Sequence, residues 1–286
     1  MIRSTALAIA LLIIPAWVSA QALDGRLKRI QETKSVAIAY RSDAAPFSFV
    51  DAASKQPTGY SIDLCKRVVG VIEQQLGVQG IQIKWVPVTL QTRMDAVAKG
   101  QADMECGSTT VTLSRMKQVS FSSFTFVDGT GLLIKASSAA NSLSDLAGKK
   151  IGVIPGTTNE KALHDALKRR VITANVVLVK SRDEGMTQLE AGTLDAFASD
   201  KTLLMGLAPK AKDPKALALL TEDLSYEPYA ITLPRNDDNF RLAVNTGLAQ
   251  IYRSGAIGEI FQRWFGAFGK PGMMLEASFI YGAIPE

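Results

Sequence analysis

The segment from Glu105 to Arg115, Glu-Cys-Gly-Ser-Thr-Thr-Val-Thr-Leu-Ser-Arg, combines residue types that can bind a small anionic molecule. Cys106 ends a strand-like approach, Gly107 breaks the strand, and hydroxyl side chains gather on the turn. Thr112 fits the N-cap of a helix whose first turn contains Arg115. A cation at this place opposes the helix dipole. Arg115 is therefore better explained as a planar, two-pronged donor for a carboxylate than as a solvated surface charge.

Five short motifs occur along the chain in an order and spacing that chance rarely imitates. They are Ala45-Pro46-Phe47-Ser48-Phe49, Gly59-Tyr60-Ser61-Ile62-Asp63, the segment from Glu105 to Arg115, Gly148-Lys149-Lys150-Ile151-Gly152-Val153 followed by Gly156-Thr157-Thr158, and Leu194-Asp195-Ala196-Phe197. With these motifs the chain resembles the periplasmic amino-acid-binding proteins of ABC importers (solute-binding protein family 3), particularly the glutamate/aspartate-binding branch. The resemblance implies an α/β, two-lobed periplasmic-binding-protein-like fold of type II, with two crossing hinge segments.

A free amino acid is a zwitterion, so a dry site must offer donors to its α-carboxylate and acceptors to its ammonium group. By resemblance, Arg115 grips the α-carboxylate with two parallel hydrogen bonds, helped by the amide of Thr158 at the start of a helix. The resemblance places the ammonium group against the carbonyl of Ser108, the hydroxyl of Thr110 and the carboxylate of Asp200.

Two more arginines match those that bind the distal carboxylate in the glutamate/aspartate branch. Arg41 precedes the Pro-Phe motif, and Arg93 begins a short helix. Two guanidinium groups desolvated together are costly without an anion between them, which favours an acidic ligand over a neutral one. Two positions depart from the branch. Leu90 stands where a serine is frequent, and Arg182 stands where a histidine can contact the ligand, so a permanent charge replaces a titratable one.

These residues predict a protein that captures glutamate or aspartate by lobe closure and delivers it to an ABC permease at the inner membrane. The departures leave another polar amino acid, or a dicarboxylate such as succinate, as alternative ligands. Asp200 argues against a dicarboxylate, because its carboxylate would be buried unpaired without an ammonium group. A dehydratase on the same fold is a further alternative, but no carboxylate among the motif residues is placed as its general acid.

Several residues also fit purely structural roles. Each arginine could be a surface residue, Ser108 and Thr110 could be turn residues, and Phe47 and Phe49 fit the core as well as a cleft wall. His164, the sole histidine, fits the surface of a polar helix, which disfavours a histidine-based triad and most metal sites. We therefore expect no cofactor, no metal and no enzyme activity.

The first residues, 1–20, have the pattern of a secretory signal peptide: Arg3 supplies a basic start, an apolar stretch follows, and Val18-Ser19-Ala20 forms a cleavage site. Removal of these 20 of the 286 residues leaves 266, with 31 basic and 27 acidic side chains. The charges form no blocks of the kind that mark nucleic-acid-binding tails. We expect a soluble, monomeric periplasmic protein without a nucleic-acid partner.

Cys65 and Cys106 are the only cysteines. Because an exported chain meets an oxidising compartment, a disulfide between them is expected, and two buried free thiols are the alternative. Cys65 falls in a helical pattern and Cys106 at the end of a strand, so the disulfide requires this helix and this strand to pack as neighbours.

Strand and helix signals alternate, which is typical of a mainly parallel sheet flanked by helices. The expected strands are 35–40, 81–88, 131–135, 150–154, 176–179, 196–199 and 229–233, and the expected helices are 62–76, 93–99, 142–146, 159–170, 184–190 and 239–265, the last divided at Gly255. Crossings near 127–131 and 225–229 place residues 21–128 and 228–286 in lobe 1 and residues 129–227 in lobe 2. The tail, 273–286, is expected to pack on lobe 1.

Overall fold

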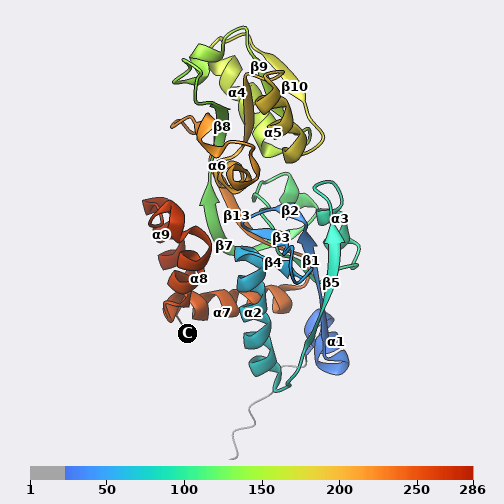
Figure 1. Cartoon of the computed structure of the whole chain (residues 1–286). Helices are drawn as coiled ribbons and strands as arrows, with labels where there is room; N and C mark the ends of the chain where they lie inside the picture. The colour runs from blue at the N-terminus through green and yellow to red at the C-terminus, as the bar shows by residue number, and fades with distance from the viewer. Residues whose placement is uncertain (1–22, 286) are drawn as a thin grey trace, which may run out of the picture.

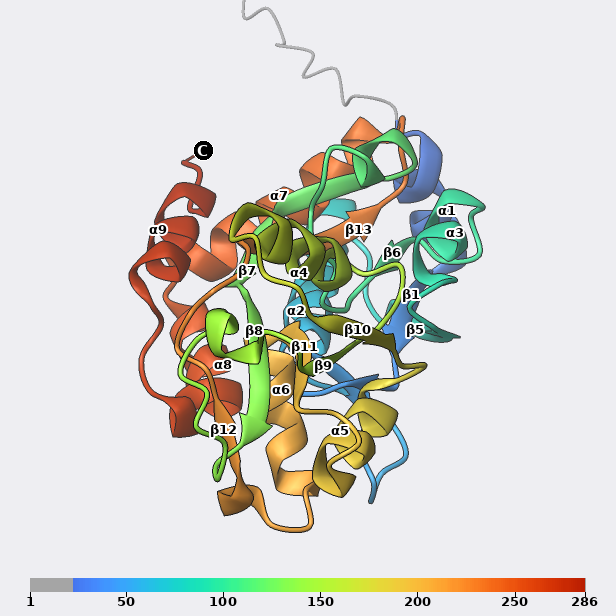
Figure 2. The same ribbon diagram turned by 90° about the horizontal axis from the view of Figure 1, so that it is seen from above.

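The chain forms two lobes, each built on its own five-stranded sheet (Figure 1). The computed structural model describes residues 23–285, so the expected signal peptide at 1–20 lies outside the described residues, as does Glu286. We call lobe 1 the part with the sheet ordered β5-β1-β6-β13-β7, and lobe 2 the part with the sheet ordered β10-β9-β11-β8-β12. Figure 2 shows the molecule from above, with lobe 2 in front of lobe 1 and α9 at the rim.

Lobe 1 contains elements from both ends of the chain. Its main sheet consists of β1 (Ser35–Arg41), β5 (Gln82–Val88), β6 (Met104–Glu105), β7 (Ser120–Asp128) and β13 (Glu227–Leu233), and a small sheet of β2 (Asp43–Ala44), β3 (Ser48–Val50) and β4 (Pro57–Thr58) lies beside it. Its helices are α1 (Gly25–Thr33), α2 (Tyr60–Leu76), α3 (Arg93–Ala98), α7 (Asp238–Arg253), α8 (Ala256–Phe265) and α9 (Met273–Gly282).

Lobe 2 is continuous in sequence. Its sheet consists of β8 (Thr130–Lys135), β9 (Lys150–Val153), β10 (Asn175–Leu178), β11 (Ala196–Asp200) and β12 (Leu217–Leu219). Its helices are α4 (Thr158–Arg169), α5 (Arg182–Ala191) and α6 (Lys201–Leu207), and the segment expected as a helix at 142–146 is a 3₁₀ turn, Leu143–Leu146, with Ser142 in a capping box.

Both sheets are mixed rather than mainly parallel. β1 pairs in parallel with β5 and β6, and β9 pairs in parallel with β10 and β11. The strands that follow the crossings, β8 and β13, pair antiparallel with both of their neighbours. The expectation of mainly parallel sheets was therefore wrong for half of the pairings, because each crossing strand enters its lobe from the opposite direction.

The chain crosses between the lobes twice, as expected. β7 continues into β8 with only Gly129 between them, and the return leads from β12 in lobe 2 to β13 in lobe 1. Side chains tie the two crossings together: the Ser225 hydroxyl donates to Glu227 Oε1 at 2.6 Å, and its oxygen lies 2.7 Å from Thr130 Oγ1. The crossings thus form one hydrogen-bonded hinge.

The apolar periodicity predicts the long helical segments 62–76 and 239–265 correctly. In α2 the buried residues recur at helical spacing, and the helix ends at Gly77 in the left-handed conformation. Gly255 separates α7 from α8 with a φ of 76°, which explains why the amphipathic pattern of 239–265 breaks there. The helix expected after Thr112 is a single 3₁₀ turn, Arg115–Lys117, although the Thr112 hydroxyl does accept from the Arg115 amide at 3.2 Å.

An aromatic cluster fills the core of lobe 1 below the hinge. The Phe47 ring lies 4.8 Å from Phe126 and 5.2 Å from Tyr229, measured between ring centroids. Phe47 is fully buried, and Phe49 packs edge-on against Trp264. Both phenylalanines therefore have packing partners within lobe 1. The tail packs on the same lobe through α9, whose Leu275 joins this core.

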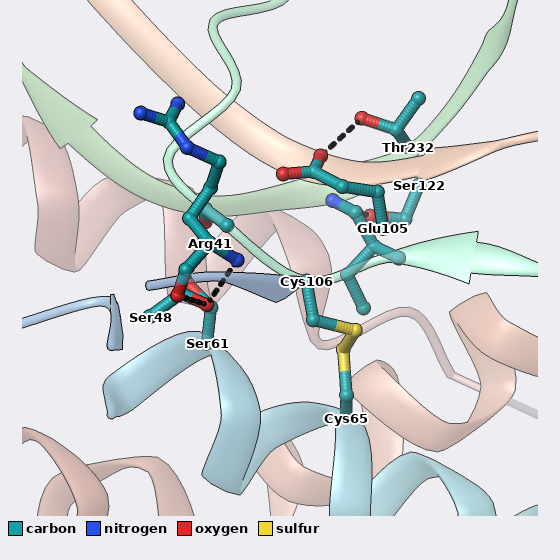
Figure 3. Close-up of a disulfide and its surroundings, with 10 residues drawn as sticks. Arg41, Ser48, Ser61, Cys65, Glu105, Cys106, Ser122 and Thr232 are labelled. Carbon is teal, nitrogen blue, oxygen red and sulfur yellow. Dashed lines mark hydrogen bonds between the residues drawn. A yellow bond between two sulfur atoms is a disulfide. The ribbon is translucent and has the colours of Figure 1, made fainter. Parts of the chain in front are cut away.

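Cys65 and Cys106 form the expected disulfide. It joins α2 to the loop after β6, and Figure 3 shows Glu105 and Arg41 close to it. The Ser61 hydroxyl of α2 also donates to the carbonyl of Gly107 at 2.7 Å. The loop that carries Arg115 is thus fastened to α2 by one covalent bond and one hydrogen bond.

We expect the double variant Cys65→Ala/Cys106→Ser to lose about 3–4 kcal/mol of unfolding free energy, because the disulfide closes a loop of 41 residues. Urea denaturation of the oxidised protein and the variant measures the difference. Titration of two free thiols in the oxidised protein would contradict the assignment.

Candidate functional site

The predicted ligand residues sit where elements begin or end. Arg41 is the last residue of β1, and Asp200 is the last residue of β11. Arg93, Thr158 and Arg182 are the first residues of α3, α4 and α5. In open α/β sheets, ligands bind beyond the carboxyl ends of the strands, where such residues meet.

The other three residues, Ser108, Thr110 and Arg115, come from the loop between β6 and β7. This loop has a fixed backbone, because Thr110 forms an antiparallel bridge with Tyr229 of β13. Nη1 of Arg115 donates to the carbonyl of Thr110 at 2.7 Å, which holds the guanidinium against the same loop. Ser108 is half-buried beside it.

Four arginines from the two lobes lie within electrostatic range of one another. Arg41, Arg93 and Arg182 are each only 4–5% exposed, and Arg115 is half-buried. Burial lowers the pKa of Arg93 to about 9, with Glu105 opposing the shift and the other three guanidinium groups adding to it. Burial also lowers the pKa of Arg115 and of Arg182. Like charges gathered in this way are typical of a binding site for an anion.

Arg93 is held by contacts within lobe 1. Its Nε donates to the Thr109 hydroxyl at 2.7 Å, and its Nη1 donates to the carbonyl of Leu90. The Leu90 side chain packs against the apolar cluster of lobe 2 that contains Leu133 and Met186. The departure from serine at this position therefore replaces a hydroxyl with an apolar contact between the lobes.

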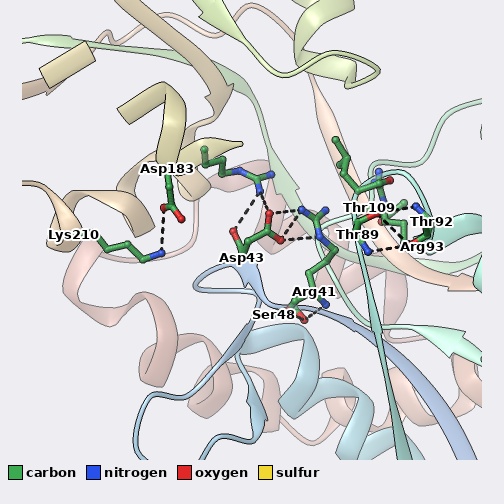
Figure 4. A network of polar contacts seen from close by, with 11 residues as sticks. Arg41, Asp43, Ser48, Thr89, Thr92, Arg93, Thr109, Asp183 and Lys210 are labelled. Carbon is green, nitrogen blue, oxygen red and sulfur yellow. Dashed lines mark hydrogen bonds and ion pairs between the residues drawn. The ribbon is translucent and has the colours of Figure 1, made fainter. Parts of the chain in front are cut away.

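Arg41 is paired with a residue that the sequence analysis did not consider. Its Nε donates to Asp43 Oδ1 at 2.8 Å and its Nη2 to Asp43 Oδ2 at 2.7 Å (Figure 4). Partial burial opposes ionisation of Asp43, but the charges of Arg41 and Arg182 hold its pKa below the usual range. The pairing of Arg41 with Asp43 could have been predicted from their spacing, because side chains two residues apart in an extended segment point to the same side.

Asp200 faces this positive cluster from lobe 2. It is 5% exposed, and its Oδ1 has no hydrogen-bond partner among the described residues. Burial and the nearby Glu227 carboxylate raise the pKa of Asp200, whereas Arg182 opposes the shift. A buried carboxylate oxygen without a partner is unusual in a folded protein and marks a place for a donor such as an ammonium group.

The two lobes touch at the predicted carboxylate site. The hydroxyls of Thr110 and Thr158 lie 3.4 Å apart, one from each lobe. The Thr157 hydroxyl caps α4 by accepting from the Glu160 amide at 3.0 Å. The amide of Thr158 is among the first-turn donors that an α-helix leaves free, so it can bind an anion.

Glu105 is a site residue that the sequence analysis overlooked. It is fully buried, and the Thr232 hydroxyl donates to its Oε2 at 2.8 Å (Figure 3). Its charge favours the ionised form of both Arg93 and Arg115. Its place at the start of the segment from Glu105 to Arg115, directly before Cys106, was the available signal.

Two carboxylates of the hinge, Asp128 and Glu227, were also missed. The Tyr229 hydroxyl donates to Asp128 Oδ2 at 3.3 Å, and the amide of Thr202 donates to the same oxygen at 3.2 Å. Burial and repulsion from Asp200 raise the pKa of Asp128 to about 8. Burial raises the pKa of both Asp128 and Asp200, so the two carboxyls titrate as an interacting pair, in which Arg182 favours the ionised form of Asp200.

This raised pKa predicts how stability depends on pH. A carboxyl that holds its proton more tightly when folded stabilises the protein below pH 4, and this stabilisation is lost as the pH rises through about 8. We expect Asp128→Asn to raise the free energy of unfolding by on the order of 1–2 kcal/mol at pH 9 and to have little effect at pH 4.

Urea denaturation at pH 4, 7 and 9 tests this expectation. Asp145→Asn is a suitable control, because hydrogen bonds lower the pKa of this exposed carboxyl, so its substitution costs stability at neutral pH. An Asp128→Asn protein that loses stability as the pH rises from 4 to 9, relative to the unaltered chain, would contradict the assignment.

The comparisons with known proteins identify the chain. A family model described as bacterial extracellular solute-binding proteins, family 3, matches residues 36–267. The chain belongs to this family.

Among residues 23–285, no helix combines the length and the apolar character that crossing a bilayer requires.

Two curated relatives of this solute-binding protein carry informative names. The L-glutamate/L-aspartate-binding protein of Pseudomonas aeruginosa is 35% identical over 262 residues, which cover 92% of this chain and 86% of the relative. The glutamate/aspartate import solute-binding protein of Salmonella typhimurium is 33% identical over 246 residues, covering 86% and 81% of the two chains.

Solved structures agree on the fold of this solute-binding protein. An ancestral amino-acid-binding protein, described as a precursor of cyclohexadienyl dehydratase, superimposes with a TM-score of 0.72 at 26% identity and covers 84% of this chain and 100% of its own. The two-lobed α/β architecture inferred from the motifs is thereby confirmed.

Proposed function

We propose that this solute-binding protein captures an acidic amino acid, glutamate or aspartate, in the periplasm and delivers it to an ABC permease at the inner membrane. One observation carries the proposal: four arginines with little or partial exposure gather around Asp200, a buried carboxylate with one oxygen that has no hydrogen-bond partner within residues 23–285. This charge pattern complements a ligand with two carboxylates and one ammonium group. The names of the curated relatives support the same ligand class.

In the proposed complex, the α-carboxylate lies between the Arg115 guanidinium and the amide of Thr158. The ammonium group binds the Asp200 carboxylate, the Thr110 hydroxyl and the carbonyl of Ser108. Because Arg115 belongs to lobe 1 and Asp200 to lobe 2, the ligand contacts both lobes and stabilises the closed state over an open one.

The distal carboxylate is assigned to Arg93 and Arg41, with the charge of Arg182 nearby. A few charge-assisted hydrogen bonds at roughly 1.5–3 kcal/mol each suffice for micromolar affinity, about −8 kcal/mol. The proposed division of the chain places residues 21–128 and 228–286 in lobe 1 and residues 129–227 in lobe 2. Cleavage of a signal peptide at 1–20, a monomeric state and the lack of a nucleic-acid partner belong to the same proposal.

A dicarboxylate ligand and a dehydratase activity are the two alternatives. A dicarboxylate would satisfy the arginines but would leave the Asp200 carboxylate unpaired, which disfavours it. The similar ancestral protein is described as a precursor of cyclohexadienyl dehydratase, so a protein with a closely similar fold has given rise to an enzyme. A general acid is the requirement for such chemistry. Among the carboxylates described above, Asp200 has an ammonium group as its proposed partner and Asp128 bonds to hinge groups, so we propose binding without catalysis.

Calorimetry on ligand-stripped protein tests the proposed function. L-glutamate and L-aspartate are expected to bind at micromolar or lower Kd, while L-glutamine and succinate bind at least about tenfold more weakly. If neither acidic amino acid gives a heat of binding and glutamine or succinate does, the proposed ligand is wrong.

Lobe closure predicts a strong effect at Gly206 in α6. A Cβ atom there would lie 2.3 Å from the carbonyl oxygen of Ala45 and 2.9 Å from its carbon, so the backbone of lobe 1 obstructs a side chain. Gly206→Ala is expected to weaken ligand binding by about tenfold or more by preventing full closure. The same change is expected to keep or raise the unfolding free energy, because alanine favours a helix by about 1 kcal/mol over glycine.

Gly258→Ala in α8 is the matched control, since, among the described residues, no atom beyond its neighbours and its own helix backbone lies within 4 Å of the added Cβ. Calorimetry and urea denaturation of both variants separate closure from stability. Unchanged affinity in the Gly206→Ala protein would show that closure does not bring α6 against Ala45.

A further inference from the structure

Asp43 connects the two lobes through two arginines. Its carboxylate accepts both hydrogen bonds from Arg41 of lobe 1, and its Oδ2 lies 3.7 Å from Nη1 of Arg182 of lobe 2. The same Nη1 donates to the backbone carbonyl of Asp43 at 3.4 Å. Figure 4 shows Asp43 beside Arg41, with the dashed contacts converging on its carboxylate.

The buried positive charge of Arg182 is stabilised by the Asp43 carboxylate. It is 5% exposed and stands in the first turn of α5, where a cation opposes the helix dipole. Arg41 repels it, and Asp43 and Asp200 are the carboxylates that favour its charged form. Asp43 alone of these two comes from lobe 1, so part of the compensation for burying Arg182 depends on contact between the lobes.

The surroundings of this bridge are packed. Leu90 of lobe 1 contacts the apolar cluster of lobe 2, and Gly206 of α6 approaches the backbone of Ala45, two residues after Asp43. The ion pair therefore forms at an interface where apolar and backbone groups also meet. Ion pairs in such partly desolvated places are stronger than fully exposed ones.

We propose that Asp43 is a positioning residue that bridges Arg41 and Arg182 and so holds lobe 2 closed over lobe 1. Part of the stability of the closed state then comes from the chain itself rather than from the ligand. Arg182 contributes to closure through Asp43, in addition to any charge that it presents to the ligand. This role of Asp43 rests on the proposed function, in which lobe closure captures the ligand, but its main test needs no ligand.

The test measures lobe closure in the ligand-stripped protein. Spin labels are attached at Ala53→Cys in lobe 1 and Lys180→Cys in lobe 2, two exposed positions, and the two native cysteines remain in their disulfide. Double electron–electron resonance gives the closed-to-open ratio. Asp43→Asn is expected to lower this ratio by about three- to tenfold, because its side chain is 43% exposed and the pair is partly screened.

A double-mutant cycle shows whether Arg182 acts through Asp43. Arg182→Gln is expected to lower the ratio by a similar factor alone, and by less than about twofold when Asp43→Asn is already present. Equal effects of Arg182→Gln in both backgrounds would overturn the proposal, as would identical distance distributions for Asp43→Asn and the unaltered protein.

Asp183→Asn is the matched control. It removes the same charge beside Arg182, but its carboxylate pairs with Lys210 within lobe 2 at 3.5 Å (Figure 4). This variant is expected to leave the closed-to-open ratio unchanged. A change equal to that of Asp43→Asn would show that any nearby negative charge has the same effect, and it would overturn the proposal. Because these distances are measured without ligand, failure of the bridge is distinct from failure of glutamate or aspartate to bind.

Discussion

Replacing Arg115 with lysine is expected to weaken L-glutamate binding by about 10- to 150-fold. Lysine keeps the charge but cannot form two parallel hydrogen bonds with a carboxylate, so one charge-assisted hydrogen bond of roughly 1.5–3 kcal/mol is lost. The lost contact of Nη1 with the Thr110 carbonyl adds to the effect, because it aims the side chain. Calorimetry of the Arg115→Lys protein measures the change.

Arg235→Lys is the control for this substitution. Arg235 is exposed and donates to the carbonyl of Lys117 at 2.7 Å, so it supports the same turn without belonging to the proposed site. Its replacement is expected to leave affinity within about twofold. If Arg115→Lys binds as tightly as this control, the α-carboxylate is held elsewhere.

Replacing Asp200 with asparagine is expected to have a still larger effect, about 100-fold or more on L-glutamate. The change removes the anion that the ammonium group pairs with, and breaking a buried ion pair costs about 3–5 kcal/mol. Glutarate, which has the two carboxylates and no ammonium group, is expected to bind the Asp200→Asn protein better than the unaltered one, since no unpaired charge remains.

The raised pKa of Asp200 gives this prediction a pH signature. The ammonium group binds the ionised carboxylate, so affinity is expected to fall as the pH drops through the raised pKa, and this dependence should vanish in Asp200→Asn. Asp195→Asn is the control, because Asp195 is exposed before the same strand and accepts from the Lys150 amide at 2.8 Å. A glutamate affinity that is unchanged in Asp200→Asn would remove the ammonium assignment.

The sequence predicted the elements with strong periodicity well. The apolar patterns of 62–76 and 239–265 became α2, α7 and α8, and the break at Gly255 was placed correctly. The mixed direction of the sheets was not predicted, because pairing across a crossing depends on tertiary structure and leaves no local pattern. β7 was not among the expected strands, and only its end near residue 127 was predicted, as part of a crossing.

The candidate site was predicted mainly through the resemblance. Arg115 stands in one of the five motifs and Asp200 three residues after another, and the structure places Arg115 in the loop between β6 and β7 and Asp200 at the end of β11. The acidic residues around them were missed for a physical reason. Glu105, Glu227 and Asp128 act through burial and through neighbours that are distant in sequence, and a carboxylate looks the same in a sequence whether buried or exposed. Asp43 was missed as well, although its spacing of two residues from Arg41 was visible in the sequence.

A crystal structure of the protein with L-glutamate tests the central claim most directly. We expect the α-carboxylate on Arg115 and the amide of Thr158, the ammonium group on Asp200, and the distal carboxylate on Arg93 and Arg41. A ligand whose ammonium group lies away from Asp200, or one bound outside the arginine cluster, would contradict the account.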